Sequence, residues 1–324
     1  MSVSGLGWKP HLEPIVRAAW ADQGQPPIYR ATVFAADTRP LPPAFSLSNL
    51  VITWMDQGPV GTCYCNAGTQ AIEVAAGAAA VAGEGVEQVR LSRAYVAWEA
   101  CKRDFESDPR NRGRRLAIDV TQGATITGVM RALDESGACR EELFPYKPDS
   151  RHLNRPPTPE MVEQAKVCQL TGVMDIELKD FDARKRSIFN GHPPVVGIWW
   201  PGAGGGRGWD QGYIDQYGRT SGVSGGGFGH ALTIIGWVDP GVWDGHLYWQ
   251  YVNSHGAIYP VPSPEMRAKV PGYRSARPDR CYTFWVRDDH ERMVFNKGMT
   301  ELIAPAGVTG FRVRSLPTWD SAMA

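Results

Sequence analysis

The sequence lacks a net charge, because 34 lysine and arginine residues balance 34 aspartate and glutamate residues in a chain of 324. Dedicated binders of nucleic acid or of anionic membranes carry excess positive charge, so a balanced chain is not expected to be one of them. The sequence also lacks an apolar run of the roughly 18 residues that a membrane span needs. We therefore expect no nucleic-acid partner and no membrane span.

The first 20 residues lack the continuous apolar segment that follows basic residues in a secretory signal. We expect synthesis in the cytoplasm without a signal peptide. Association with a virion, or export by a non-classical route, would be compatible with this.

The six cysteines lack the paired C-x-x-C spacing of a structural zinc site. Cys63 and Cys65 are separated by a single residue, which is too close for an ordinary disulfide. The glycines at 204–206 lack the strand and helix that flank a phosphate-binding loop. We expect no metal and no cofactor, and free thiols of the kind found in a reducing compartment.

What the sequence does contain is a change of pattern near its middle. The first half shows helical periodicity at 67–83, 91–103 and 125–137. The second half shows short β-like runs at 167–178, 194–200, 231–238, 247–253 and 281–287, separated by turns. This order predicts an α+β fold of two lobes with a site in the groove between them.

The stretch 57-QGPVGTCYCNAG-68 has the features of a nucleophile site. Cys63 follows a glycine-bearing turn and opens a predicted helix, whose dipole and free N–H groups stabilise a thiolate. Gln57, six residues upstream, is placed to donate its side-chain amide to an oxyanion. Cys65 lies about 200° further round the helix, so we expect it to point into the core.

A partner base is expected among the seven histidines. His230 stands where a glycine-rich loop enters an apolar strand, a position suited to proton transfer, although it is also what a histidine that merely opens a strand would show. Asn253 ends the next predicted strand. Its amide oxygen is suited to orient the imidazole through the second ring nitrogen, because the ends of adjacent strands lie close together.

These residues give the chain a resemblance to the papain-like cysteine proteases, of a bacterial or phage type. The stretch 57-QGPVGTCYCNAG-68 corresponds to a QG-x-x-GSCW run in that family, and 248-YWQYVNSHG-256 corresponds to a strand ending in NSWG. Between them lies 229-GHALTIIGW-237, so the order Gln, Cys, His, Asn is kept. Weaker similarities occur at 41-LPPAFSL-47, 144-FPY-146 and 193-PPVVGI-198.

The resemblance implies a two-lobed fold, with an N-terminal helical lobe, a C-terminal antiparallel β-barrel-like lobe and the active-site cleft between them. It places the catalytic domain at 41–287, with the helical lobe at about 57–150 and the β lobe at about 160–287. Residues 1–40 would be an N-terminal extension, either an arm or a short pro-segment, and 288–324 a C-terminal extension. Both extensions are candidates for protein assembly.

The resemblance also implies roles for the site residues. Cys63 would be the nucleophile, His230 the general base and acid, and Asn253 the residue that orients His230. Gln57 and the Cys63 backbone N–H would form the oxyanion hole. The implied reaction is hydrolysis of peptide bonds in a peptide or protein substrate through a thioester acyl-enzyme.

Two residues depart from the family pattern and are expected to modulate the site. Tyr64 stands in place of a tryptophan and keeps a large aromatic side chain. His255 stands where a tryptophan usually shields the bond between asparagine and histidine, so the rate or its pH dependence is expected to differ.

Other functions remain open at this point. The same scaffold serves endopeptidases, exopeptidases and amidases of the peptidoglycan type. A papain-like module with a structural or binding role in a phage particle or a secreted bacterial complex, with weak or no activity, is the main alternative. An acyltransferase or transglutaminase-like enzyme is a third, although those sites more often pair histidine with aspartate.

Overall fold

The computed structural model describes residues 7–22, 28–30, 38–201, 219–220, 227–295 and 301–311. The helices are α1 (Glu13–Ala21), α2 (Cys63–Val81), α3 (Arg93–Ser107), α4 (Ile126–Glu135), α5 (Ser150–Leu153), α6 (Pro159–Ala165), α7 (Phe181–Phe189), α8 (Pro264–Ala268) and α9 (Asp288–Phe295). The strands are β1 (Ile28–Arg30), β2 (Ala44–Ser46), β3 (Val173–Glu177), β4 (Val195–Pro201), β5 (Arg219–Thr220), β6 (Gly227–Val238), β7 (Tyr248–Val252), β8 (Tyr259–Pro260), β9 (Arg280–Cys281), β10 (Thr283–Arg287) and β11 (Glu301–Pro305).

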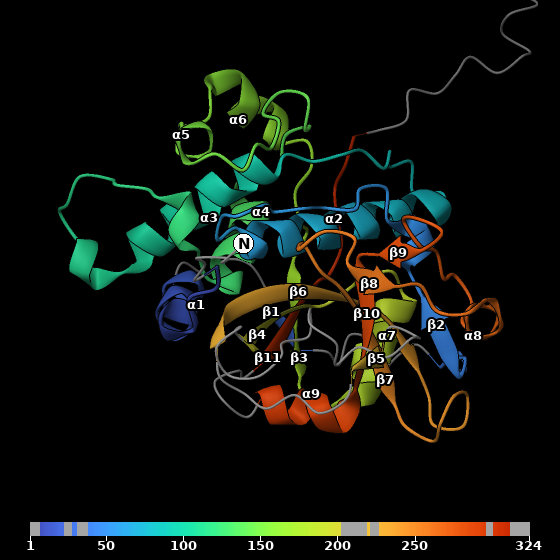
Figure 1. The fold of residues 1–324 in the computed structure, drawn as a ribbon. Helices are drawn as coiled ribbons and strands as arrows, with labels where there is room; N and C mark the ends of the chain where they lie inside the picture. Colours follow the sequence, from blue (N-terminus) through green and yellow to red (C-terminus); the bar gives the residue numbers. More distant parts are fainter. Residues whose placement is uncertain are drawn as a thin grey trace, which may run out of the picture.

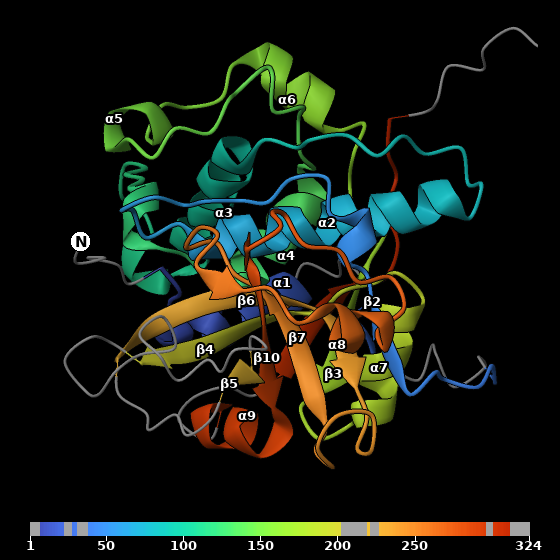
Figure 2. The same ribbon diagram turned by 45° about the vertical axis from the view of Figure 1, so that its right-hand side comes forward.

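Helix α2 lies between two layers of structure (Figure 1). Helices α3 to α6 lie on one side of it and the sheet lies on the other, an arrangement that Figure 2 shows from a second direction. All but one of its residues from Cys63 to Ala79 are buried, which explains why the sequence there is rich in alanine. Gly68 has no space for a Cβ atom because Val129 of α4 packs directly against it.

The neighbouring helices begin where side chains cap them. Ser92 accepts a hydrogen bond from the Tyr95 N–H at the start of α3, and Thr125 accepts one from the Gly128 N–H at the start of α4. Such caps satisfy N–H groups that have no partner inside the helix. The sequence predicted helices at 91–103 and 125–137; α3 and α4 lie there, and both helices pack in the helical lobe.

The β lobe is built on a sheet with the strand order β1-β3-β11-β4-β6-β7-β10-β5, while β2 pairs with β6. Its central pairings, β4 with β6, β6 with β7 and β7 with β10, are antiparallel. Strand β6 faces α2, and the Thr233 hydroxyl donates to the Ala67 carbonyl across the boundary between the lobes at 2.8 Å. The predicted α+β fold class, with a helical lobe and an antiparallel β lobe, is therefore confirmed.

Segments from both ends of the chain contribute to these lobes. Strand β11 pairs with β3 and β4 inside the sheet, and β1 pairs with β3. Helix α9 lies on the side of the β lobe far from the helical lobe (Figures 1 and 2). Its Glu291 carboxylate forms a fully buried ion pair with Arg184 of α7, at 2.7 Å. Near the other end, α1 packs against α3 and α4.

Candidate active site

Cys63 is the first residue of α2 and lies where the helical lobe meets β6. Thr62, which precedes it, makes no side-chain cap, so the first N–H groups of α2 are not satisfied by a capping side chain. The Ala231 N–H of β6 points at the sulfur, with an N to Sγ distance of 3.3 Å. A backbone donor and a helix N-terminus therefore both face the Cys63 sulfur, and both favour its thiolate form.

His230 of β6 and Asn253, the residue that directly follows β7, meet as predicted. Their side chains are joined by a hydrogen bond of 2.8 Å between His230 Nε2 and Asn253 Oδ1. Asn253 is held by its own neighbours, because its amide nitrogen donates to the Tyr259 hydroxyl and its oxygen also accepts from the Ser254 N–H. His230 directly precedes Ala231, whose N–H reaches Cys63, so the three predicted catalytic residues are brought together.

Gln57 is buried and fixed in orientation beside Asn253. Its backbone N–H donates to the Ser254 carbonyl at 2.8 Å, and its side-chain oxygen accepts from the Ser254 hydroxyl at 2.6 Å. Its side-chain nitrogen donates to the Val60 carbonyl at 2.8 Å. An amide nitrogen carries two N–H groups, so this bond leaves a second one to donate. The turn that carries these residues passes through Gly58, whose φ of 65° suits glycine.

A buried arginine supports this turn, and the sequence analysis did not identify it. Arg93 of α3 donates to the Asp56 carbonyl at 3.1 Å and to the Asn66 side chain at 2.8 Å, and its guanidinium lies over the ring of Tyr146. The Tyr146 hydroxyl donates to the Gln57 carbonyl. The turn before Cys63 is thereby tied to the helical lobe.

Of the two residues expected to modulate the site, Tyr64 points into the helical lobe and His255 lies beside His230. Tyr64 is fully buried and points into the helical lobe, where its hydroxyl donates to the Val120 carbonyl at 2.8 Å. The His255 ring lies next to the ring of His230, with 4.4 Å between centroids. Cys65 is buried, as predicted, and its thiol donates to the Thr62 carbonyl. All six cysteines are free.

The N-terminal segment crosses the site directly over Cys63. Gly7 lies so close to the Cys63 sulfur that a Cβ atom at this position would overlap it. The Trp8 ring packs against Gly197 and Gly229 in the same way, since a Cβ atom on either glycine would overlap Trp8. Cys63 is 0% exposed and His230 is 1% exposed. The site is therefore closed to solvent in this structure.

Backbone bonds hold this segment to both lobes. On the helical side, Gly7 accepts from the Ala124 N–H at 3.3 Å and the Lys9 N–H donates to the Ala124 carbonyl at 3.1 Å. On the β side, the Trp8 N–H donates to the Gly229 carbonyl at 3.3 Å. Residues 7–9 therefore bridge the two lobes.

Helix α1 anchors the segment to the start of α4. The Glu13 carboxylate accepts from the backbone N–H groups of Ile126, at 2.5 Å, and of Thr127, at 3.1 Å, and from the Trp8 ring nitrogen at 2.8 Å. A carboxylate is stabilised at a helix N-terminus by its free N–H groups and by the helix dipole. Hereafter "the arm" means residues 7–21, the crossing segment and α1 together.

Comparison with known proteins identifies the fold of the chain. No protein-family model and no curated protein sequence matches the chain. Solved structures do match it. Xylellain, a cysteine protease from Xylella fastidiosa, is 19% identical, with a TM-score of 0.57 over 87% of this chain and 89% of that one.

Two further structures match over similar lengths. Procathepsin L 3 from the larval midgut of Tenebrio molitor is 15% identical, with a TM-score of 0.54 over 91% of this chain and 79% of that one. Procathepsin B S9 from Trypanosoma congolense is also 15% identical, with a TM-score of 0.54 over 85% of this chain and 80% of that one. The chain has the fold of the papain-like cysteine proteases.

Within this papain-like fold, burial of the site disfavours the charged forms of Cys63 and His230. Burial raises the pKa of the Cys63 thiol to about 12, although the Ala231 N–H acts to lower it. Burial lowers the pKa of His230 well below its usual range, and the nearby His255 lowers it further. Both groups are therefore neutral at pH 7 while the arm is in place.

Two features are absent from the described part of the papain-like domain. It holds no group of three or more His, Cys, Asp or Glu residues arranged to bind a metal ion. None of its helices is long and apolar enough to cross a membrane.

Proposed function

We propose that this chain is a cysteine peptidase that its own N-terminal arm keeps latent. The observation that carries the proposal is that the N–H of Ala231, the residue after His230, lies on the Cys63 sulfur while Asn253 is bonded to the His230 ring. Ser254, the residue after Asn253, holds the Gln57 side chain next to them. The papain-like fold, shared with cysteine proteases, supports it.

The proposed reaction begins once the arm has left and water has entered the site. His230 then takes the Cys63 proton, which gives a thiolate beside an imidazolium. The sulfur attacks the carbonyl carbon of a peptide bond, and the oxygen, which gains the negative charge, accepts hydrogen bonds from the Gln57 amide and the Cys63 N–H.

The remaining steps use the same groups. The C–N bond breaks as His230 gives its proton to the leaving amine, and a thioester to Cys63 remains. Water, deprotonated by His230, hydrolyses the thioester and restores the thiol. Asn253 keeps the imidazole in the orientation that both proton transfers require.

The test is covalent labelling with a thiol-reactive epoxide. The full-length chain is compared with a chain that carries a specific protease site within residues 23–27 and has been cut there, so that the arm can dissociate. We expect rapid modification of Cys63 in the cut chain, slow modification in the intact chain, and none at this position in Cys63→Ser. Absence of reaction in the cut, folded chain would overturn the proposal.

A structural or binding role is the second candidate, and the complete burial of Cys63 favours it. In that case the arm would be a permanent part of the domain. The same experiment separates the two, because a permanent arm would stay bound after cutting and would leave Cys63 unreactive.

A further inference from the structure

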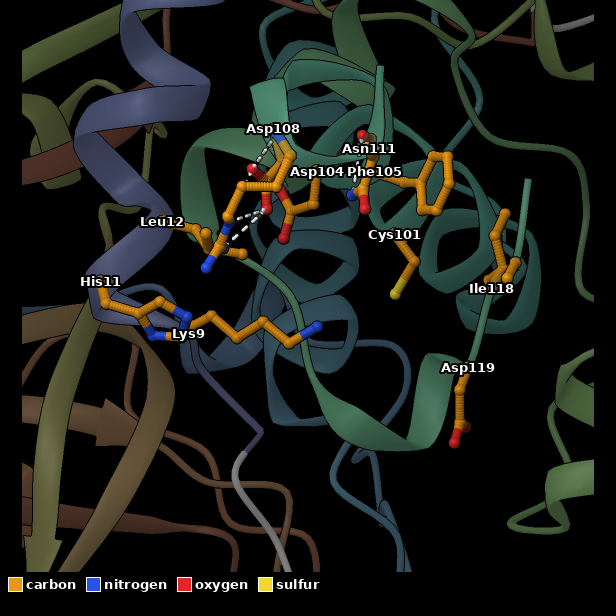
Figure 3. A pocket seen from close by; sticks show the side chains of 12 residues that line it. Lys9, His11, Leu12, Cys101, Asp104, Phe105, Asp108, Asn111, Ile118 and Asp119 are labelled. Atoms are coloured by element: carbon orange, nitrogen blue, oxygen red, sulfur yellow. Dashed lines mark hydrogen bonds and ion pairs between the residues drawn. The ribbon is translucent and has the colours of Figure 1, made fainter. Parts of the chain in front are cut away.

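Beside the arm lies a cavity of about 280 Å³ that is lined with carboxylates (Figure 3). Lys9 of the arm extends into it, and Asp104, Asp108 and Asp119 lie around it. Resting on the proposed peptidase function, we propose that this cavity is a substrate subsite for a basic side chain, and that arginine suits it better than lysine.

The path of the arm indicates where a substrate chain must lie. A peptide attacked by Cys63 has to pass over the sulfur, where Gly7 now lies. The backbone groups that face this passage are the Ala124 N–H and carbonyl on one side and the Gly229 carbonyl on the other. Because these groups recognise any peptide backbone, the hollows beside the arm are those that substrate side chains would meet.

The two side chains that follow Gly7 enter different hollows. Trp8 packs onto Gly197 and Gly229 of the β lobe, whereas Lys9 points toward α3 and the loop that follows it. Side chains alternate in this manner along an extended chain, and Trp8 forms a bridge with Ala124. A substrate residue adjacent to the one that lies over Gly197 and Gly229 is therefore directed into the acidic cavity, as Lys9 is.

The carboxylates of the cavity are fixed by their neighbours. Asp104 accepts from the Thr125 N–H at 2.8 Å and from the Thr125 hydroxyl at 2.6 Å. Asp119 accepts from the Thr121 hydroxyl at 2.6 Å and from the Asn154 amide at 3.2 Å. Neither can rotate away without losing these bonds, so both carboxyl groups keep their places in the wall of the cavity before a ligand binds.

The charges of the cavity are unbalanced once the arm has left. Arg110 pairs with Asp108 through both carboxylate oxygens, at 2.9 and 2.7 Å. Asp104 and Asp119 then face the cavity without a cation, because Lys9 and His11 both belong to the arm. Burial raises the pKa of Asp104 to about 7, and the Lys9 charge acts to lower it. A cationic substrate side chain would act in the same direction, so the negative charge of Asp104 is favoured when a cation is bound and Asp119 supplies the charge of the empty cavity.

The space in the cavity favours arginine. Figure 3 marks no ion pair between Lys9 and the carboxylates, and the volume remaining beside Lys9 exceeds what its ammonium needs. A guanidinium is larger and presents five N–H donors in a planar arrangement that matches carboxylates. It would reach carboxylate oxygens with which the ammonium of Lys9 forms no ion pair.

The first test uses the arm of the full-length chain as the ligand. The rate of Cys63 alkylation by iodoacetamide, read by peptide mass spectrometry, reports how often the arm opens. We expect Lys9→Glu to react about threefold faster than the unaltered chain, Lys9→Met to lie between them, and Lys9→Arg to react more slowly, as weak to moderate charge pairing predicts.

Two controls accompany this series. Lys179→Glu removes an exposed cation from the β lobe and should leave the rate unchanged. Asp119→Lys combined with Lys9→Glu restores opposite charges and should bring the rate back toward that of the unaltered chain. Equal rates for the glutamate, methionine and arginine variants at position 9 would overturn the proposal.

The second test measures substrate preference on the cut chain described above. Peptides carry an aromatic residue with arginine, lysine, glutamine or glutamate on either side of it. We expect kcat/KM to fall in that order at one flanking position, by about tenfold from arginine to glutamine, and the preference to be lost in Asp119→Asn.

The outcomes separate the two proposals. Cleavage without any preference for a basic residue overturns the subsite and leaves the peptidase function intact. Failure of the cut chain both to cleave and to react with the epoxide overturns the peptidase function. The alkylation series at position 9 then still decides whether the cavity binds a cation.

Discussion

Replacement of Trp8 by alanine should open the site. Trp8 is 3% exposed, its ring packs on two glycines, and its ring nitrogen donates to Glu13. Truncating a buried tryptophan to alanine costs about 3 kcal/mol or more. In this chain the cost falls on the closed state of the arm, because the groups that Trp8 contacts are exposed to water when the arm leaves.

The size of the effect follows from this free energy. A difference of about 3 kcal/mol shifts an equilibrium by about 100-fold, at 1.4 kcal/mol for each factor of ten. If the arm opens and closes faster than the reagent reacts, the alkylation rate of Cys63 follows the open population and rises by the same factor. Trp8→Phe keeps part of the packing and should give an intermediate rate.

The assay is alkylation of Cys63 in the full-length chain, followed together with thermal unfolding. Trp243→Ala is the matched control, because Trp243 packs against Trp285 in a separate cluster of the β lobe. It should lower the unfolding temperature without the large increase in labelling. If the Trp8→Ala chain stays folded and its Cys63 is alkylated at the rate of the unaltered chain, Trp8 does not hold the arm closed.

Three further predictions concern the site and its supporting helix. In the cut chain, Gln57→Ala should lower kcat by about 100-fold or more with little change in KM, since an oxyanion donor acts in the transition state; an effect confined to KM would contradict this role. His255→Phe should raise the pKa of His230, because a neighbouring charge that lowers it is removed. The alkaline limb of the pH profile of kcat/KM should then move to higher pH. A limb that stays in place or moves to lower pH would contradict this prediction. Burial raises the pKa of Glu73 of α2 from 4.5 to about 8, so the folded state holds this proton more tightly than the unfolded state and loses stability as pH rises between these values. Glu73→Gln should therefore raise the free energy of unfolding in urea more at pH 8 than at pH 5. An equal effect at both pH values would count against the burial argument.

The parts of the site that were predictable from sequence are those set by local chemistry. Ser92 and Thr125 have the side chains that cap helices, and α3 and α4 begin there. His230 and Asn253 were expected to meet because they end adjacent strands, and they are joined at 2.8 Å. In each case a short stretch of sequence carries the physical cause.

The closure of the site by the arm could not be predicted from local sequence patterns. Gly7 and Trp8 lie in a stretch with no periodicity, and their contacts with Cys63, Gly197 and Gly229 are with residues more than 50 positions away in sequence. Glu13 satisfies the start of a helix at position 126, which no local motif signals. Residues 288–324 were expected to form an extension, whereas β11 pairs inside the sheet between β3 and β4 through contacts that a single sequence does not reveal.

The most direct measurement of the central claim is to trap the intermediate. The cut chain is mixed with a peptide that contains an arginine next to an aromatic residue, quenched in acid, and mapped by mass spectrometry. We expect an acyl group on Cys63, which Gln57→Ala forms more slowly and Cys63→Ser does not form as a thioester. Peptide cleavage that persists in Cys63→Ala, or a cut and folded chain that never acquires an acyl group or yields product, would contradict it.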